Sequence, residues 1–304
     1  MKPTIVVHGG AGAWRRDNDA AVREALRESL LAGGAILARG GGAVDAVQAA
    51  VELLEDAPWF NAGRGAVATA DGTVELDAAI MDGAGRRAGA CAAVRHIRHP
   101  IALARVILED TPHVLVVGEG AERVAAAAGL ERVGPEWFER AHAVSGPEPV
   151  PAGGGVAARA AAIPYDEAET VGAVAVDAAG HVAAATSTGG MRGQLPGRVG
   201  DAPLPGAGTY AEDGVCAVSG TGDGEAFITA LAAHEVAAMI RHAGLPLDEC
   251  CRLVLRGRVG GTGGLVAVTP AGDVALPFTT PAMARGLLRD GEQPLVAIGP
   301  EELA

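Results

Sequence analysis

Thr170 is the residue of this chain whose type and position best suit nucleophilic chemistry. It opens the apolar run 170–177, directly after a segment at 143–169 that is rich in Gly, Pro and Ala. If the bond between Glu169 and Thr170 is cut, one residue carries both a hydroxyl and a free α-amine. Such an amine has an unperturbed pKa of about 7.7–8.0 and can act as the base for its own hydroxyl. The alternative is a Thr present only for its preference for strands.

Gly-rich segments that also carry hydroxyl or charged side chains follow Thr170 along the chain. They read TSTGG at 186–190, PGRVGD at 196–201, GAGTYA at 206–211 and SGTGDGE at 219–225. The last stands where a strand is expected to end and a helix to begin. Since glycine permits tight turns and a close approach of the backbone to a bound molecule, these segments predict the walls of a binding site.

The glycine-rich motifs typical of phosphate loops are not met. Gly10-Ala11-Gly12 follows an apolar run, but the third glycine of GxGxxG would fall on Arg15, and no GxxxxGK[ST] occurs. His8 has no second histidine at metal-ligand spacing. With 24 Lys and Arg against 37 Asp and Glu, the formal charge of −13 argues against a nucleic-acid partner.

Four further motifs lie in the first half of the chain. They are HGGAG at 8–12, NAGRGAV at 61–67, LDAAIMDG at 76–83 and HPIALAR at 99–105. Together with TVGAVAVD at 170–177 and the four segments after it, they stand in a characteristic order and spacing. In these motifs the chain resembles the plant-type asparaginase and isoaspartyl peptidase family of N-terminal-nucleophile hydrolases, over most of 1–130 and 170–240.

The resemblance implies an α/β fold, namely a four-layer αββα sandwich that is one structural domain. It also implies a precursor that cuts itself before Thr170. The products would be an α chain of residues 1–169, ending in a flexible linker at about 143–169, and a β chain of residues 170–304. The two chains would stay together, and relatives form dimers of such αβ pairs.

The same resemblance implies roles for the catalytic residues. Thr170 is the expected nucleophile and, through its amine, the base, while the Thr188 hydroxyl holds the polar end of the nucleophile. The oxyanion hole is expected from Thr221 and from the backbone N–H of Gly222, because donors at a strand-to-helix turn suit a developing negative charge. Asn61 would support the nucleophile region, although a turn preference alone also explains an Asn there.

Substrate-binding residues are implied in the same way. Arg198 resembles the clamp for the substrate α-carboxylate, which a guanidinium can bind bidentately. Asp201 resembles the acceptor of the substrate α-ammonium, and Gly222 and Gly224 would let the backbone approach the substrate. An Arg and an Asp three residues apart are common on protein surfaces, so these assignments depend on the resemblance.

A structural sodium ion is also implied, with no cofactor for catalysis. Relatives hold the ion with backbone carbonyls, which suit hard cations and leave no signature in the side chains. The matching carbonyls would be those of Leu54, Glu55, Ala57, Phe60, Ala62 and Arg64. One departure from the family is Glu169, where relatives usually have Gly. Its bulk and charge beside the attacked carbonyl leave the rate of self-cleavage open, but not the identity of Thr170.

The expected activity is hydrolysis of β-aspartyl amide bonds, in L-asparagine or in isoaspartyl dipeptides, through an ester on Thr170. The sequence does not rank these substrates, because Arg198 and Asp201 would bind the aspartyl half that both share. One alternative is a glycosylasparaginase-like amidase, which a missing signal sequence counts against. Another is an uncut, non-catalytic homologue, suggested by Glu169.

Composition sets the remaining expectations. Hydrophobic residues make up 49% and aromatic residues 3%, so Ala, Val, Leu and Ile must build the core. No apolar run is long enough for a transmembrane helix, and no membrane partner is expected. The four cysteines lack metal-ligand spacing, and a reduced, cytoplasmic protein is the expectation.

Hydrophobic periodicity and turn residues predict the elements that must position these residues. Helices are expected at 17–37, 44–54, 100–109, 121–128, 223–241 and 248–256. Strands are expected at 5–7, 73–81, 113–117, 170–177, 181–186, 215–218, 265–268 and 274–278. Residues 8–12 are expected to form a tight turn, 170–186 a hairpin and 265–278 a closing hairpin. Because strands and helices come in blocks, the pattern favours layered sheets covered by helices.

Overall fold

A computed structural model describes residues 2–13, 18–138, 170–301 and 303. The helices are α1 (Asp19–Ala38), α2 (Ala43–Asp56), α3 (Pro100–Asp110), α4 (Gly118–Ala127), α7 (Gly224–Ala230), α8 (Ala232–Ala243) and α9 (Leu247–Gly257). The strands are β1 (Thr4–Gly12), β2 (Leu76–Asp82), β3 (Arg87–Val94), β4 (Leu115–Val117), β5 (Val171–Val176), β6 (Val182–Thr188), β7 (Thr209–Glu212), β8 (Cys216–Gly222), β9 (Gly263–Val268), β10 (Val274–Ala275), β11 (Ala282–Arg289) and β12 (Leu295–Ala297).

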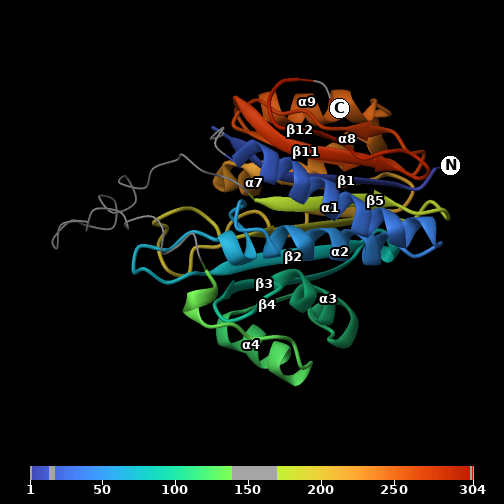
Figure 1. Cartoon of the computed structure of the whole chain (residues 1–304). Coiled ribbons are helices and arrows are strands. Elements are labelled where there is room, and N and C mark those ends of the chain that lie inside the picture. The colour runs from blue at the N-terminus through green and yellow to red at the C-terminus, as the bar shows by residue number, and fades with distance from the viewer. Residues whose placement is uncertain (1, 14–17, 139–169, 302, 304) are drawn as a thin grey trace.

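The strands form two sheets. The larger has the order β12-β11-β1-β5-β6-β2-β3-β4, in which β3 and β4 are parallel and the other neighbours are antiparallel. The smaller has the order β10-β9-β8-β7. Every residue of β2, β5 and β6 is buried, as expected for central strands covered on both faces. The protein therefore has a mixed α/β fold with two sheets flanked by helices (Figure 1).

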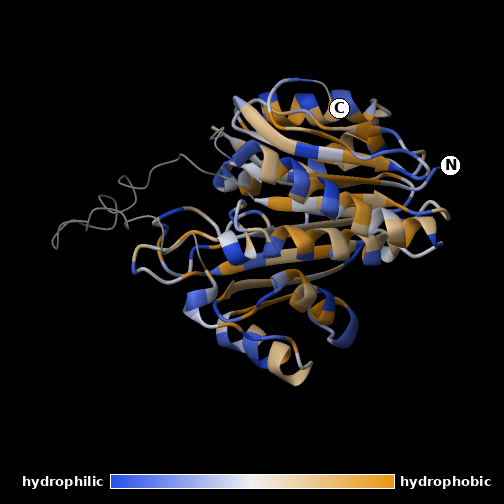
Figure 2. Cartoon of the chain, viewed as in Figure 1, coloured by the Kyte–Doolittle hydropathy of each residue, from blue (hydrophilic) through white to orange (hydrophobic). Residues whose placement is uncertain are grey.

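The side chains of the central strands alternate between two hydrophobic cores. On β5, Val171 and Ala173 join a core that includes residues of α1, α2 and α3. Val174 and Val176 instead join a core built from the smaller sheet, α8 and α9. Since successive strand side chains point to opposite faces, one face of the larger sheet packs on helices and the other on the smaller sheet. In Figure 2 the apolar residues follow these strands and the helix faces turned toward them.

The β5–β6 hairpin carries Thr170 at its open end. Its register runs from Val171 opposite Ser187 to Val176 opposite Val182, which confirms the hairpin predicted from the sequence. The predicted hairpin of β9 and β10 is confirmed as well. Helices α8 and α9 lie near the C-terminus at one end of the molecule, and α3 and α4 lie at the other end (Figure 1).

Two predicted elements differ from the structure. Residues 8–12 are not a tight turn, because β1 continues to Gly12 with a bulge between His8 and Ala11, where Gly10 has a φ of 104°. The single helix predicted at 223–241 is broken at Leu231, which has a left-handed φ of 47°. The first turn of α8 donates backbone N–H groups to the carbonyls of 206 and 207, which redirects the second helix.

The sequence prediction included no strand at β3 or β7, and it stopped at the closing hairpin, which two further strands follow. β11 pairs with β1 along its length and β12 pairs with β11. The predicted linker at 143–169 and Glu169 lie outside the described residues. In the described part of the chain, none of the helices combines the length and the apolar character needed to cross a membrane.

Candidate active site

Thr170 lies on the face of the larger sheet that packs on the smaller one. Its side chain is buried, and its Oγ1 donates a hydrogen bond to Thr188 Oγ1 at 3.0 Å. Thr188 Oγ1 also accepts from the backbone N–H of Gly190 at 3.1 Å. The structure thus brings together the predicted nucleophile and the hydroxyl expected to hold it. The Thr188 oxygen is itself fixed by a backbone donor.

A buried histidine that sequence reasoning passed over touches the same residue. His8 Nδ1 lies 3.0 Å from the carbonyl oxygen of Thr170, and its Nε2 lies 2.8 Å from Ser219 Oγ. Burial lowers the pKa of His8 to about 3, although the bond to Thr170 offsets part of the effect. The ring is therefore neutral, with one donor and one acceptor. A carbonyl only accepts, so Nδ1–H donates to Thr170 and Nε2 accepts from Ser219.

A series of buried hydroxyl groups continues from Ser219 on β8 of the smaller sheet to Thr186 on β6 of the larger sheet. Ser219 Oγ lies 2.8 Å from Thr186 Oγ1, which lies 2.6 Å from Thr209 Oγ1. Thr209 Oγ1 in turn lies 2.9 Å from the carbonyl oxygen of Ala202. The hydroxyls therefore join the start of β5 to the loop that carries Asp201. The only sequence feature that points to this hydroxyl network is that Thr186 and Ser219 belong to two of the glycine-rich motifs.

Arg198, Asp201 and Gly224 lie together beside this network. A Cβ added to Gly224 would lie 2.7 Å from Arg198 Nη2 and 3.0 Å from Asp201 Oδ1. Any side chain at 224 would therefore fill the space that both charged groups face. Asp201 is buried, and within the described residues its Oδ2 has no hydrogen-bond partner. A buried carboxylate oxygen without a partner is costly, and an ammonium group of a substrate would supply one.

The predicted role of Asp201 implies that binding of an ammonium group depends on pH. Burial raises the pKa of its carboxyl to about 7, and the neighbouring Arg198 offsets part of that rise. Because only the carboxylate attracts an ammonium group, L-aspartate should inhibit more strongly as pH rises through about 7. Below that value its inhibition constant should rise by up to about tenfold per pH unit, as for a single titrating group. The measurement is inhibition against pH, and equal pH profiles for the parent and Asp201→Asn would contradict the assignment.

Glu225 is a functional candidate that sequence reasoning missed. Arg198 Nε and Nη2 donate to its two carboxylate oxygens at 3.0 and 2.8 Å. Although burial opposes it, this ion pair raises the pKa of Arg198. Arg198 Nη1 also donates to Gln194 Oε1 at 3.3 Å. The guanidinium is therefore oriented from two sides, and Glu225 shows that a carboxylate fits it bidentately.

Thr221 and Gly222 close β8 where α7 is about to begin. Thr221 Oγ1 accepts from the backbone N–H of Ala11 at 3.3 Å, which attaches it to the end of β1. Gly222 has a φ of 145°, and a Cβ there would lie 2.4 Å from the carbonyl oxygen of Thr262. The side chain of Asp223 then caps α7 by accepting from Ala226 N–H. This is the strand-to-helix turn at which the oxyanion donors were predicted.

Asn61 is fully buried behind Thr188. Its Nδ2 donates to the carbonyl of Gly190 at 2.6 Å, and its Oδ1 accepts from Val67 N–H at 3.0 Å. Its own carbonyl accepts from Gly189 N–H at 2.9 Å. The bonds to Gly189 and Gly190 tie the loop of 61–67 to the segment that follows Thr188, and the bond from Val67 closes the loop on itself. Asn61 therefore lies where the sequence predicted a supporting residue.

The residues predicted to bind sodium form a tightly wound segment at the end of α2. A Cβ added to Gly63 would lie 2.3 Å from the carbonyl oxygen of Glu55, and one added to Gly65 would lie 2.2 Å from that of Phe60. Carbonyl oxygens thus approach Gly63 and Gly65 closely, in space that a side chain at either position would fill. The carbonyls of Leu54 and Ala62 accept backbone hydrogen bonds from 57 and 65.

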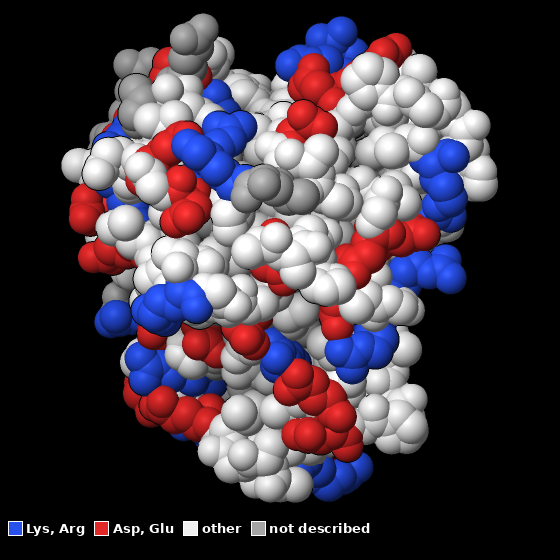
Figure 3. Space-filling view, turned by 90° about the vertical axis from the view of Figure 1, so that its right-hand side faces the viewer, with Lys and Arg blue, Asp and Glu red and all other residues white. Residues whose placement is uncertain are grey.

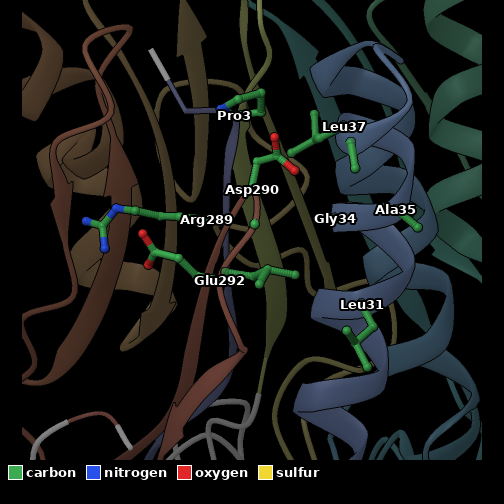
Figure 4. Close-up of a pocket in the computed structure, with 11 residues that line it drawn as sticks. Pro3, Leu31, Gly34, Ala35, Leu37, Arg289, Asp290 and Glu292 are labelled. Atoms are coloured by element: carbon green, nitrogen blue, oxygen red, sulfur yellow. The ribbon is translucent and has the colours of Figure 1, made fainter.

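Other features of the described chain lie apart from this cluster. A pocket between α1 and the turn after β11 has Leu31 and Leu37 on one side and Asp290 on the other (Figure 4). It lies at the Pro3 end of β1, away from His8. No group of His, Cys, Asp and Glu within the described residues could hold a metal ion. On the face shown in Figure 3, acidic and basic side chains are interspersed.

Comparison with known proteins identifies the family. A family model described as asparaginase matches residues 1–298. An isoaspartyl peptidase of Salmonella typhimurium is 47% identical over 308 residues, covering 98% of each chain. A plant-type L-asparaginase of Pyrobaculum calidifontis is 43% identical, covering 95% of this chain and 98% of its own. A human isoaspartyl peptidase/L-asparaginase is 40% identical, covering 96% and 95%. The chain therefore belongs to the asparaginase family.

Proposed function

We propose that this protein hydrolyses β-aspartyl amide bonds, converting L-asparagine to L-aspartate and ammonia, cleaving isoaspartyl dipeptides, or both. Relatives named isoaspartyl peptidase and plant-type L-asparaginase support this activity over nearly the full length of the chain. The observation that carries it is the presence of two groups of residues: Thr170 hydrogen-bonded to Thr188, and Arg198 and Asp201 facing the same space beside Gly224. One group of residues supplies a hydroxyl nucleophile, and the other complements an α-carboxylate and an α-ammonium.

The reaction follows from these positions. Thr170 Oγ1 attacks the side-chain carbonyl of the substrate, and its proton passes to the α-amine that cleavage has freed. Thr221 and the N–H of Gly222 stabilise the negative charge on the tetrahedral oxygen. The leaving amine takes the proton as the carbon–nitrogen bond breaks, which leaves a β-aspartyl ester on Thr170. Water then attacks the ester with the same amine as base, releasing aspartate and restoring the hydroxyl.

We further propose that the two sheets and their helices form a four-layer αββα sandwich of the N-terminal-nucleophile type. The two hydrophobic cores on opposite faces of the larger sheet support this arrangement. Residues 1–169 would be the α chain and 170–304 the β chain of one domain, and two αβ pairs would form a dimer. Because β5 pairs with β1, the two chains would remain joined after cleavage.

A sodium ion is proposed for the segment 54–64 as a structural element. The carbonyls of Glu55 and Phe60, which approach the Gly63–Gly65 turn, would be among its ligands. Bound there, the ion would fix the segment that precedes Asn61. No catalytic step passes through it.

Self-processing is the experiment that tests this proposal. After incubation at neutral pH, the denatured protein should separate into chains of 169 and 135 residues, the second beginning with Thr170. Intact-mass measurement over time gives both the site and the rate. Because Glu169 adds bulk and charge beside the attacked carbonyl, cleavage should be slow, and Glu169→Gly should accelerate it. Activity in a chain cut at another bond would exclude Thr170, and permanently intact, inactive protein would favour the non-catalytic alternative.

A further inference from the structure

Two buried carboxylates hold the loop that carries Arg198. Glu75 precedes β2 and Asp77 is its second residue, so their side chains share one face of the extended chain. Glu75 Oε2 accepts from the N–H of Gly197 at 2.7 Å, and Asp77 Oδ2 accepts from the N–H of Gly200 at 3.2 Å. The two accepted donors bracket Arg198. The loop is thus fastened on both sides of the guanidinium-bearing residue.

Each carboxylate has a second partner that fixes its own position. Glu75 is 3% exposed, and its Oε1 accepts from Arg95 Nη2 at 2.6 Å. Asp77 is 2% exposed, and its Oδ1 accepts from the N–H of Ala93 on β3 at 2.9 Å. Buried carboxylates with such partners are rigid anchors, because losing either bond leaves a buried oxygen without a donor.

Asp77 also lies opposite the residue that holds the nucleophile. In the pairing of β2 with β6, Asp77 stands directly opposite Thr188, which accepts the hydrogen bond from Thr170. Asp77 therefore connects the loop of 197–200, through its bond to Gly200, with Thr188 on β6. A change there shifts Arg198 relative to Thr170 without touching either side chain.

We propose that Glu75 and Asp77 are positioning residues that place Arg198 for binding of the substrate α-carboxylate. The inference rests on the proposed function, since it assumes that Arg198 binds that carboxylate. The two residues touch neither the substrate nor the reacting atoms. They hold the backbone of 197–200, and their effect on the reaction passes through Arg198. A substrate lacking the α-carboxylate would be insensitive to them.

Kinetics of Asp77→Asn and Glu75→Gln test this role. An amide keeps one acceptor oxygen and loses the other, so each variant loses one charge-assisted bond. We expect KM to rise about tenfold and kcat to stay within about twofold, as befits the loss of one hydrogen bond to a charged group. Inhibition by L-aspartate should weaken by the same factor. Inhibition by β-alanine, which lacks only the α-carboxylate, should not change.

Asp82→Asn is the matched control on the same strand. Asp82 also accepts from a backbone N–H, that of Ala84, and pairs with Arg87, but it lies at the far end of β2. It should reproduce any loss of thermal stability without the change in KM. Unchanged KM in both test variants, or equal weakening of L-aspartate and β-alanine, would overturn the positioning role. An inactive but fully cleaved parent would instead refute the proposed function. If Asp77→Asn does not fold, Glu75→Gln decides.

Discussion

Thr170→Ala should abolish both self-cleavage and hydrolysis while the fold survives. One oxygen performs both reactions, so its removal should lower kcat by about 10⁴-fold or more, as in other hydrolases that lose their nucleophile. The hydrogen bond to Thr188 is lost as well, but Thr188 keeps its donor from Gly190. Chain mass, release of ammonia from asparagine and release of amino acid from a β-aspartyl dipeptide measure the two reactions separately.

Conservative variants distinguish a nucleophile from a strand residue. Thr170→Ser keeps the oxygen and should retain part of both activities, and Thr170→Cys should cleave at least slowly because a thiol can make the same acyl shift. If Thr170 serves only the strand, all three variants should stay active, with stability changes of about 1 kcal/mol from β-propensity. Full hydrolysis by Thr170→Ala would therefore refute the proposed mechanism.

Arg198→Ala and Asp201→Ala should each lower kcat/KM strongly but leave cleavage at Thr170 intact. Each removes the charged partner of one substrate group in a buried site, which costs on the order of 2–5 kcal/mol. That corresponds to a loss of roughly thirty-fold or more, because about 1.36 kcal/mol is a factor of ten. The internal acyl shift uses neither group. Steady-state kinetics and the mass of the processed chains are measured on the same samples.

An exposed arginine provides the control for these variants. Arg252 pairs with Asp248 one turn away on α9, and both side chains are about half exposed. Surface pairs of this kind contribute little, so Arg252→Ala should keep the parent kcat/KM. Glu225→Gln tests the remaining part of the site, because the amide leaves Arg198 only one of its two bonds to residue 225. Parent activity in Arg198→Ala would remove that residue from the binding site.

Local patterns in the sequence were enough to predict most elements, and the resemblance to the family supplied most of the site. The apolar runs around the turn at 178–180 predicted the hairpin of β5 and β6. Because a hairpin register is set locally, the predicted hairpin agrees with the pairing of Thr170 and Thr188, which the resemblance to the family had implied. The glycines of 219–225 likewise marked the end of β8, and Gly224 proved to face Arg198 and Asp201. The two helices at 223–241 were read as one, since the contact that turns α8 comes from the loop of 206–208.

Only the tertiary structure decided which buried polar groups lie around Thr170 and around the loop that carries Arg198. His8 and Thr170 are 162 positions apart, and they meet because β1 inserts beside β5 in the larger sheet. The carboxylates of Glu75 and Asp77 reach donors more than 120 positions away. Nothing in the spacing of these residues indicates such partners. Buried donors and acceptors must be paired, but the order of the strands determines with which groups they pair.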